Sequence, residues 1–143
     1  MCMYLKNGKV DRSHSKVNSD GYLVGYKVIY NNDRSFTYSS HGWKEGLNRS
    51  NRRTVTIRKT EKEHGNILTG FHAFVTKKAA KSYKENGVKR YTKTIKIYYK
   101  PTDIVSYGYT EVLEKHLKKC LKTVVVTKCM VKSLEVVKSL EGI

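Results

Sequence analysis

The sequence predicts an α+β fold, a mostly antiparallel twisted sheet with two short helices packed on it. Most of the expected elements are short runs of aromatic and β-branched residues joined by turn residues, and only two segments have helical end signals. The 143 residues include 38% hydrophobic residues and a single proline, which suffices for one core. We therefore expect one domain over 1–143, with 1–20 loosely ordered and 132–143 as a C-terminal extension.

Short strands dominate the first half of the chain. Residues 22–30 (YLVGYKVIY) form an apolar strand, and the turn at 31–33 before a second run at 35–38 predicts a hairpin. Residues 39–52 carry glycines and asparagines around Trp43, which is typical of an irregular loop pinned by one aromatic side chain. Further strands are expected at 3–5, 54–58 and 71–75, with a loop at 61–66.

The first helix is predicted over 77–86. Thr76 is a natural N-cap, and Gly87 stands in the position that ends many helices. The helical period gives this segment an apolar side, formed by Ala79, Ala80 and Tyr83, and a basic side, formed by Lys77, Lys81 and Lys84.

The second half adds strands and the second helix. Residues 91–99 alternate between an apolar and a polar face until Pro101, which predicts a strand. Thr110 is positioned to cap a helix over 111–119, with lysines near its C-terminus where cations suit the helix dipole. The remaining expected strands are the extended segment 103–108 and the β-branched run 123–131, the latter placed centrally in the sheet.

Charge is the strongest functional signal. The chain has 29 Lys and Arg against 12 Asp and Glu, a formal net charge of +17. Such an excess destabilises the compact state by self-repulsion, so an anionic partner is the usual reason for it. The alternative is a lysine- and asparagine-rich composition that reflects an AT-rich genome, with solvated lysines that bind nothing in particular.

The densest basic segment is 77–100, where nine cations and one acid, Glu85, give nine minus one, or +8. A helix and the following strand are expected to gather these cations on one surface, suited to nucleic acid, a nucleoprotein complex or an acidic host protein. The candidate residues are Lys77, Lys78, Lys81, Lys84, Lys89, Arg90, Lys93, Lys96 and Lys100.

Two further anion-binding features are possible in the sequence. Tyr98 could stack on a base, or pack beneath a helix as a core residue. The loop residues Arg49, Arg52 and Arg53 could pair with phosphate or carboxylate, or stay solvated. The motifs of the common nucleic-acid modules are missing, so binding would be led by shape and charge.

Chemistry of other kinds finds little support. The three cysteines, Cys2, Cys120 and Cys129, and the five histidines have no metal-like spacing, and we expect no metal, cofactor or catalytic group. Removal of Met1 could expose Cys2 as a terminal nucleophile, but a chance occurrence is the simpler explanation. No apolar run approaches the roughly 18 residues that span a bilayer, and the first ten residues lack a signal-peptide core, so a cytoplasmic protein without membrane contact is expected.

A first resemblance to a known family lies in two parts of the chain: the segment 70–83 (GFHAFVTKKAAKSY) and the strand ending in 103–108 (DIVSYG). With the Met-Cys start, the Gly25-Tyr26-Lys27-Val28 strand and the Trp43 loop, they resemble small bacteriophage accessory proteins. The resemblance implies a host-facing role in the host cytoplasm and, by extension, inhibition of CRISPR or nucleotide-signalling immunity. It implies no catalytic residues.

The same segment is similar to the central motif of ADP-ribosyltransferases, which lines an NAD site. That family also uses a His or Arg in its first strand and a Glu in its last, whereas this chain has Lys27 and no acid in 124–131. The resemblance implies a nucleotide pocket near Phe71, His72 and Tyr83, in a signalling-nucleotide sponge or a degenerate transferase. In the alternative interpretation these three side chains belong to the core.

Overall fold

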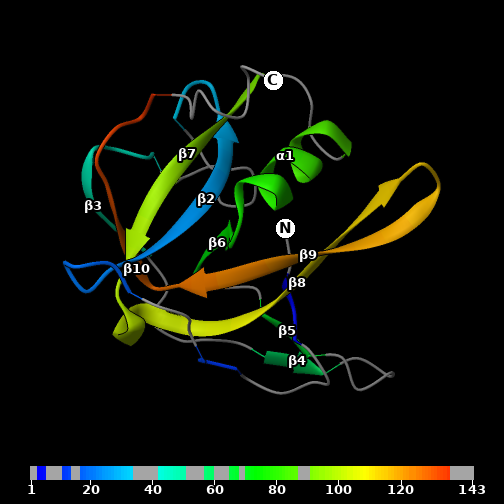
Figure 1. The fold of residues 1–143 in the computed structure, drawn as a ribbon, viewed down its shortest axis with the longest axis horizontal. Coiled ribbons are helices and arrows are strands. Elements are labelled where there is room, and N and C mark those ends of the chain that lie inside the picture. Colours follow the sequence, from blue (N-terminus) through cyan, green and yellow to red (C-terminus); the bar gives the residue numbers. More distant parts are fainter. Residues whose placement is uncertain are drawn as a thin grey trace.

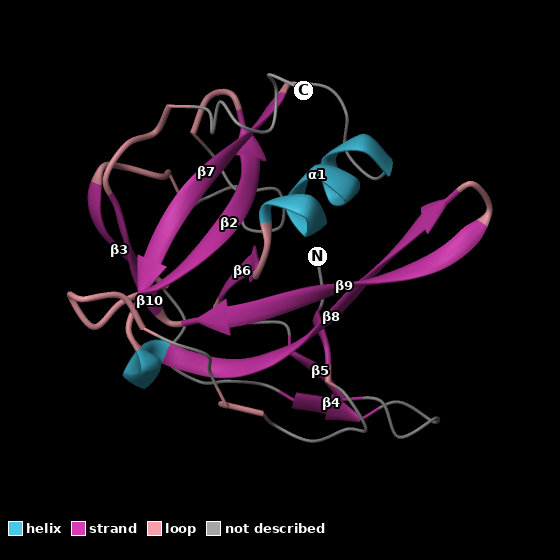
Figure 2. Ribbon diagram, in the orientation of Figure 1, coloured by secondary structure: helices cyan, strands magenta, loops and turns pink. Residues whose placement is uncertain are grey.

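A computed structural model shows an antiparallel sheet with one α-helix packed on it (Figures 1 and 2). The expected α+β class with a mostly antiparallel sheet is confirmed. The structure describes residues 3–5, 11–13, 17–33, 42–50, 57–59, 65–67, 70–86 and 91–135.

Among these residues the sheet has the strand order β3-β10-β7-β2-β6-β9-β8-β1-β5-β4, and every pairing is antiparallel. The first seven strands in this order form the main sheet, and three very short strands extend it beyond β8. The strands are β1 (Met3–Tyr4), β2 (Leu23–Tyr30), β3 (Gly46–Arg49), β4 (Ile57–Lys59), β5 (Gly65–Ile67), β6 (Phe71–Phe74), β7 (Thr92–Tyr99), β8 (Ile104–Glu114), β9 (Leu117–Val126) and β10 (Lys128–Val131). The helix is α1 (Lys77–Asn86), and a 3-10 turn, η2 (Pro101–Asp103), precedes β8.

The sheet is strongly curled around its main core. Trp43, just before the edge strand β3, packs on Phe71 of β6 with ring centroids 4.7 Å apart, although β10, β7 and β2 lie between those strands. Trp43 is 4% exposed, so it is buried as predicted and anchors the segment that leads into β3. The buried side chains inside the curl come from alternate positions of β2, β6, β7 and β9, among them Leu23, Ile29, Ala73, Ile95, Ile97, Val124 and Val126.

Helix α1 covers the other face of the sheet. The Thr76 hydroxyl accepts a hydrogen bond from the Ala79 amide at 3.1 Å, so the expected N-cap and the expected bounds of this helix are confirmed. Ala79 and Ala80 are buried against Val28 and Phe74. The predicted apolar side of the helix therefore lies on the sheet, and its lysines point outward.

The second expected helix, over 111–119, is wrong. These residues belong to a long hairpin in which β8 and β9 pair from Ile104↔Val126 to Glu114↔Leu117 (Figure 2). Thr110 is not a helix cap, because its hydroxyl lies 2.9 Å from that of Thr123 on the facing strand. Cross-strand pairing along the hairpin overrides the helical propensity of the segment.

Several strand boundaries also differ from the prediction. The segment expected as a loop at 39–52 contains β3, and the run 123–131 is divided at Thr127 between β9 and β10, which pair with different strands. The strand expected at 54–58 is described only at its end, where β4 begins at Ile57, and β5 begins within the loop expected at 61–66. The strand expected at 35–38 lies outside the described residues.

Candidate functional site

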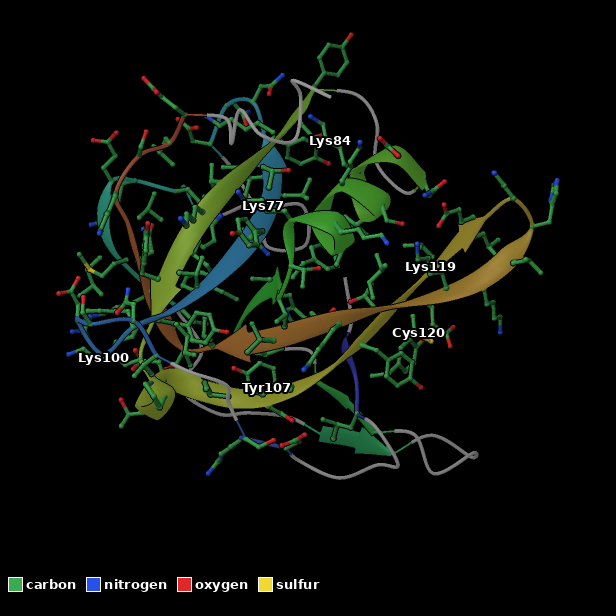
Figure 3. The ribbon with its side chains drawn as sticks, in the orientation of Figure 1. Lys77, Lys84, Lys100, Tyr107, Lys119 and Cys120 are labelled. Atoms are coloured by element: carbon green, nitrogen blue, oxygen red, sulfur yellow. The ribbon has the colours of Figure 1, made fainter. Side chains whose placement is uncertain are left out.

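Helix α1 presents its lysines to solvent, as expected. Lys77 and Lys78 are exposed in the first turn, where no acidic residue accompanies them. Lys81 lies 3.9 Å from Glu85, and Lys84 is half-buried in the last turn (Figure 3). Cations at a helix N-terminus oppose the helix dipole, usually by about 0.3–1 kcal/mol each. The first turn of α1 therefore has a strongly positive electrostatic potential.

The lysines of α1 continue onto the β8–β9 hairpin. Lys78 lines a hollow of about 250 Å³ together with Lys119 and Lys122 of β9, beside Thr76 at the start of the helix. Figure 3 shows Lys119 and Cys120 on the hairpin strand that passes beneath α1. We call Lys78, Lys115, Lys119 and Lys122 the α1–hairpin cluster.

One acid, Glu114, lies within this cluster. Its carboxylate accepts a hydrogen bond from the Lys119 ammonium at 3.0 Å. That contact, followed by the charges of Lys115 and Lys78, lowers the pKa of Glu114 below its ordinary value. The cluster contains four lysines and this one carboxylate, so its net charge is positive and it still attracts anions. Lys115, Lys119 and Lys122 were not predicted as site residues, because the sequence places them in a separate helix and its flank.

The residues of β7 that were predicted to belong to the basic surface have different neighbours from one another. Lys93 forms an ion pair with Asp33. The Lys96 ammonium lies 5.6 Å from the centroid of the Tyr98 ring. The ammonium of Lys132, the residue after β10, lies 4.5 Å from the same centroid. Tyr98 is partly exposed, with these two ammonium groups at its ring.

At the other end of β7, Lys100 lies 5.5 Å from the ring of Tyr22. The structure therefore does not gather the described lysines of 77–100 on one surface, because the strand spreads its lysines over both faces and both ends of the sheet. Arg49 is exposed on the edge strand β3. Lys89, Arg90, Arg52, Arg53 and Cys2 lie outside the described residues.

The three residues expected around a nucleotide are not brought together. Phe71 points into the curl toward Trp43, whereas His72, its neighbour in β6, is 2% exposed and its Nδ1 lies 3.3 Å from the Gly70 carbonyl. Tyr83 packs on Phe74 beneath α1 at 4.9 Å between ring centroids. Neither of the two cavities described here is lined by any of these three residues.

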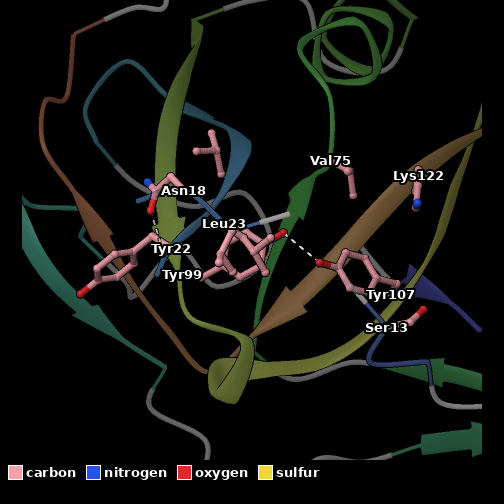
Figure 4. Close-up of a pocket in the computed structure, with 10 residues that line it drawn as sticks. Ser13, Asn18, Tyr22, Leu23, Val75, Tyr99, Tyr107 and Lys122 are labelled. Atoms are coloured by element: carbon pink, nitrogen blue, oxygen red, sulfur yellow. Dashed lines mark hydrogen bonds between the residues drawn. The ribbon is translucent and has the colours of Figure 1, made fainter. Parts of the chain in front are cut away.

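A second cavity lies at the mouth of the curled sheet, where β2 begins and β6 and β7 end (Figure 4). We call it the mouth pocket. Its volume is about 310 Å³. At its base the hydroxyl groups of Tyr99 and Tyr107 contact each other at 3.3 Å. The lining residues are Ser13, Val17, Asn18, Tyr22, Leu23, Val24, Val75, Tyr99, Tyr107 and Lys122.

Burial controls the protonation of this tyrosine pair. Desolvation raises the pKa of Tyr99 far above its ordinary value, and the hydrogen bond with Tyr107 raises it further. Desolvation also raises the pKa of Tyr107. Both phenols are therefore neutral at physiological pH and can donate hydrogen bonds.

Inside the curl, Lys27 of β2 is 6% exposed among apolar side chains. Desolvation lowers the pKa of Lys27 to about 8, against a smaller opposing effect of the Cys129 thiol. Burial raises the pKa of Cys129 to about 12, so the thiol stays protonated beside the amine. Lys27, the residue at the first-strand position of the transferase motif, is thus a core residue far from solvent.

The described part of the chain contains neither a metal cluster nor a membrane-spanning helix. No group of three or more His, Cys, Asp or Glu side chains there could hold a metal ion. Among the same residues, no helix has the length and hydropathy to cross a bilayer.

Comparison with protein-family models, with curated proteins and with solved structures finds no match for this chain. The α1–hairpin cluster and the mouth pocket are therefore the features of this chain that point to a function.

Proposed function

We propose that this chain is a small basic accessory protein that binds an anionic macromolecule, nucleic acid in the first instance, through the α1–hairpin cluster. The observation that carries the proposal is the hollow beside the start of α1, which Lys78 lines from the helix and Lys119 and Lys122 line from β9. The hollow lies at the positive end of a helix dipole, and lysine side chains beside such an end are suited to a phosphate backbone.

The charge of the whole chain supports the same partner. A formal net charge of +17 draws any polyanion toward the protein, and the cluster supplies a place where that attraction is focused. A phage-type accessory role, such as host takeover or inhibition of host defence, would be exercised through that contact. An acidic host protein would meet the same lysines without the phosphate geometry.

The test compares two triple variants of equal charge. Replacing Lys78, Lys119 and Lys122 with Gln removes the lysines of the hollow, and replacing Lys44, Lys96 and Lys132 with Gln removes three lysines elsewhere. Binding of duplex DNA and of single-stranded RNA is measured by fluorescence anisotropy from low to physiological salt. On B-DNA, removal of each lysine that neutralises a phosphate should lower the slope of log K against log salt by roughly 0.9.

We expect the first variant to lose most of its affinity and slope, and the second to lose little. Equal losses in the two variants would show that net charge, and not the cluster, governs binding. Absence of DNA and RNA binding at low salt, with retention of an acidic protein from host extract, would replace nucleic acid with that protein as the partner.

A further inference from the structure

The mouth pocket has the position and size of a ligand site. It opens at the end of a curled sheet, as ligand sites in β-barrels commonly do, and small-molecule pockets range from roughly 300 to 1,000 Å³. With a volume of about 310 Å³ it suits a small ligand. The turn that frames its rim is fixed by Asn18, whose side-chain oxygen accepts hydrogen bonds from the amides of Asp20 and Tyr22.

The walls of the pocket favour a flat, apolar body. Leu23, Val24 and Val75 supply aliphatic surface from β2 and the end of β6. The rings of Tyr99 and Tyr107 add aromatic surface (Figure 4). The Tyr99 ring also packs closely on Gly25. A Cβ atom added at Gly25 would lie 3.3 Å from Tyr99 Cε1. Aromatic side chains pack well on a planar ligand in offset or edge-to-face geometry.

The tyrosine pair leaves one hydrogen-bond donor free. Each phenol has one hydrogen, and only one of the two can be shared across the 3.3 Å contact between Tyr99 and Tyr107. Tyr99 is 1% exposed and Tyr107 is 7% exposed, so water satisfies the second hydrogen poorly. The described residues offer that second hydrogen no acceptor, and a ligand oxygen in the pocket would supply one.

Positive charge borders the same place. Lys122 lines the pocket, and its ammonium lies 5.8 Å from the Tyr107 ring. Two acids lie nearby: Asp20 is exposed in the rim turn, and the Asp11 carboxylate accepts two hydrogen bonds from Ser13. The Lys122 ammonium beside Tyr107 favours an anionic group at this end of the pocket.

We propose that the mouth pocket binds a small aromatic anion, with its ring against the tyrosines and valines and its anionic group at the Tyr107 hydroxyl and the Lys122 ammonium. Aromatic phosphates and carboxylates of this shape share the required chemistry, and nucleotides with one phosphate fall within the class. The site is separate from the proposed nucleic-acid surface except for Lys122, which borders both cavities.

The experiment is a titration of the 15N-labelled chain followed by NMR, with phenyl phosphate and benzoate as probes. Inorganic phosphate and benzyl alcohol serve as the two halves of the ligand. We expect at least one aromatic anion to cause saturable shifts at the amides of Tyr22, Val75 and Tyr107. Its dissociation constant should be at least tenfold lower than that of either half. Preference between phenyl phosphate and benzoate identifies the anionic group.

Two variants separate this pocket from the basic surface. Tyr107→Phe removes the hydroxyl and should weaken probe binding roughly fivefold, the effect of one hydrogen bond. Asn18→Asp keeps the acceptor of the rim turn, adds a negative charge beside the pocket and should also weaken binding several-fold. Neither variant should change binding of duplex DNA.

Shifts confined to α1 and to residues 119–121, equal for phenyl phosphate and inorganic phosphate and unchanged in both variants, would overturn the proposal. So would the lack of any saturable shift up to millimolar probe. Because DNA binding is measured on the same variants, failure of the pocket and failure of the nucleic-acid surface give different results.

Discussion

The hydroxyl groups of Tyr99 and Tyr107 lie 3.3 Å apart, although β2, β6 and β9 separate their strands in the sheet. This contact spans the curl and fixes the base of the mouth pocket. Tyr99→Phe leaves the Tyr107 hydroxyl without its partner, so we expect the free energy of unfolding to fall by about 1 kcal/mol or more.

Urea denaturation of the single and double variants of this pair measures their coupling. Tyr99→Phe/Tyr107→Phe should be less destabilising than the sum of the two single changes, because no unpaired hydroxyl remains. Tyr91→Phe, at a side chain that is 77% exposed, is the control and should change stability by less than about 0.5 kcal/mol. Strict additivity of the pair would contradict the coupling.

Lys27 should make the protein more stable at alkaline than at neutral pH. The pKa of Lys27 is lowered from 10.5 to about 8, so its burial as a cation costs about 3 kcal/mol below pH 8, where the amine is charged in both states. Between pH 8 and 10.5 the unfolded state binds more protons and this cost fades. Lys27→Met should raise the unfolding free energy at pH 7 by up to that amount, and by much less near pH 10.

Comparison of each variant with the parent at the same pH removes the opposite contribution of Cys129. Its pKa is raised from 9.0 to about 12, which lowers stability as pH rises through that range in both proteins. Lys96→Met, on the half-exposed face of β7, is the matched control and should show no such pH dependence. A constant gain from Lys27→Met across pH would mean that packing alone causes it.

Gly70 should tolerate no side chain. Its φ is +92°, and a Cβ there would lie 2.7 Å from Val125 Cγ1 and 3.1 Å from the Val126 carbonyl oxygen. Gly70→Ala combines left-handed strain with a clash in the centre of the sheet, so we expect a loss of more than about 2 kcal/mol in chemical denaturation. Gly21→Ala has a similar φ of +81° but open space, and should lose only about 1 kcal/mol.

The turn of the β8–β9 hairpin can be improved. Lys115 and His116 have φ values of +51° and +67°, the conformation that two-residue hairpin turns reserve for Asn-Gly. Replacing the pair with Asn-Gly should raise the free energy of unfolding by about 1 kcal/mol or more, and the unfolding midpoint with it. An Ala-Ala pair at the same positions retains both Cβ atoms and should give no gain. A gain from Ala-Ala would show that charge, and not backbone strain, limits this turn.

The same turn explains the largest error of the sequence prediction. Lys115 and His116 are ordinary helix residues with no Gly or Asn to mark a turn, and Thr110 with the following glutamate imitates a helix start. Only the pairing with β9 shows that the segment is a strand. By contrast, the ends of α1 were predictable, because Thr76 caps it through a local hydrogen bond.

The candidate sites were less predictable than the elements. The lysines of α1 were recognised from composition, but their neighbours Lys119 and Lys122 come from a strand that was expected to be a helix and its flank. The mouth pocket joins Ser13, Val75 and Tyr107 across the curl, and no short-range pattern in the sequence connects such distant positions. Phe71 and His72, which were expected near a nucleotide, are neighbours in β6. Neighbouring residues of a strand point to opposite faces of the sheet, so the two side chains cannot line one pocket.

The central place of β9 determines when this sheet can be completed. It joins β6 to β8, and the Asp11 amide reaches Ser106 Oγ across 95 residues of sequence. During translation, at roughly 5–20 residues per second, the early strands therefore wait for partners made near the end of synthesis. Assembly of the sheet is therefore late and dominated by distant pairings, a topology that favours slow folding.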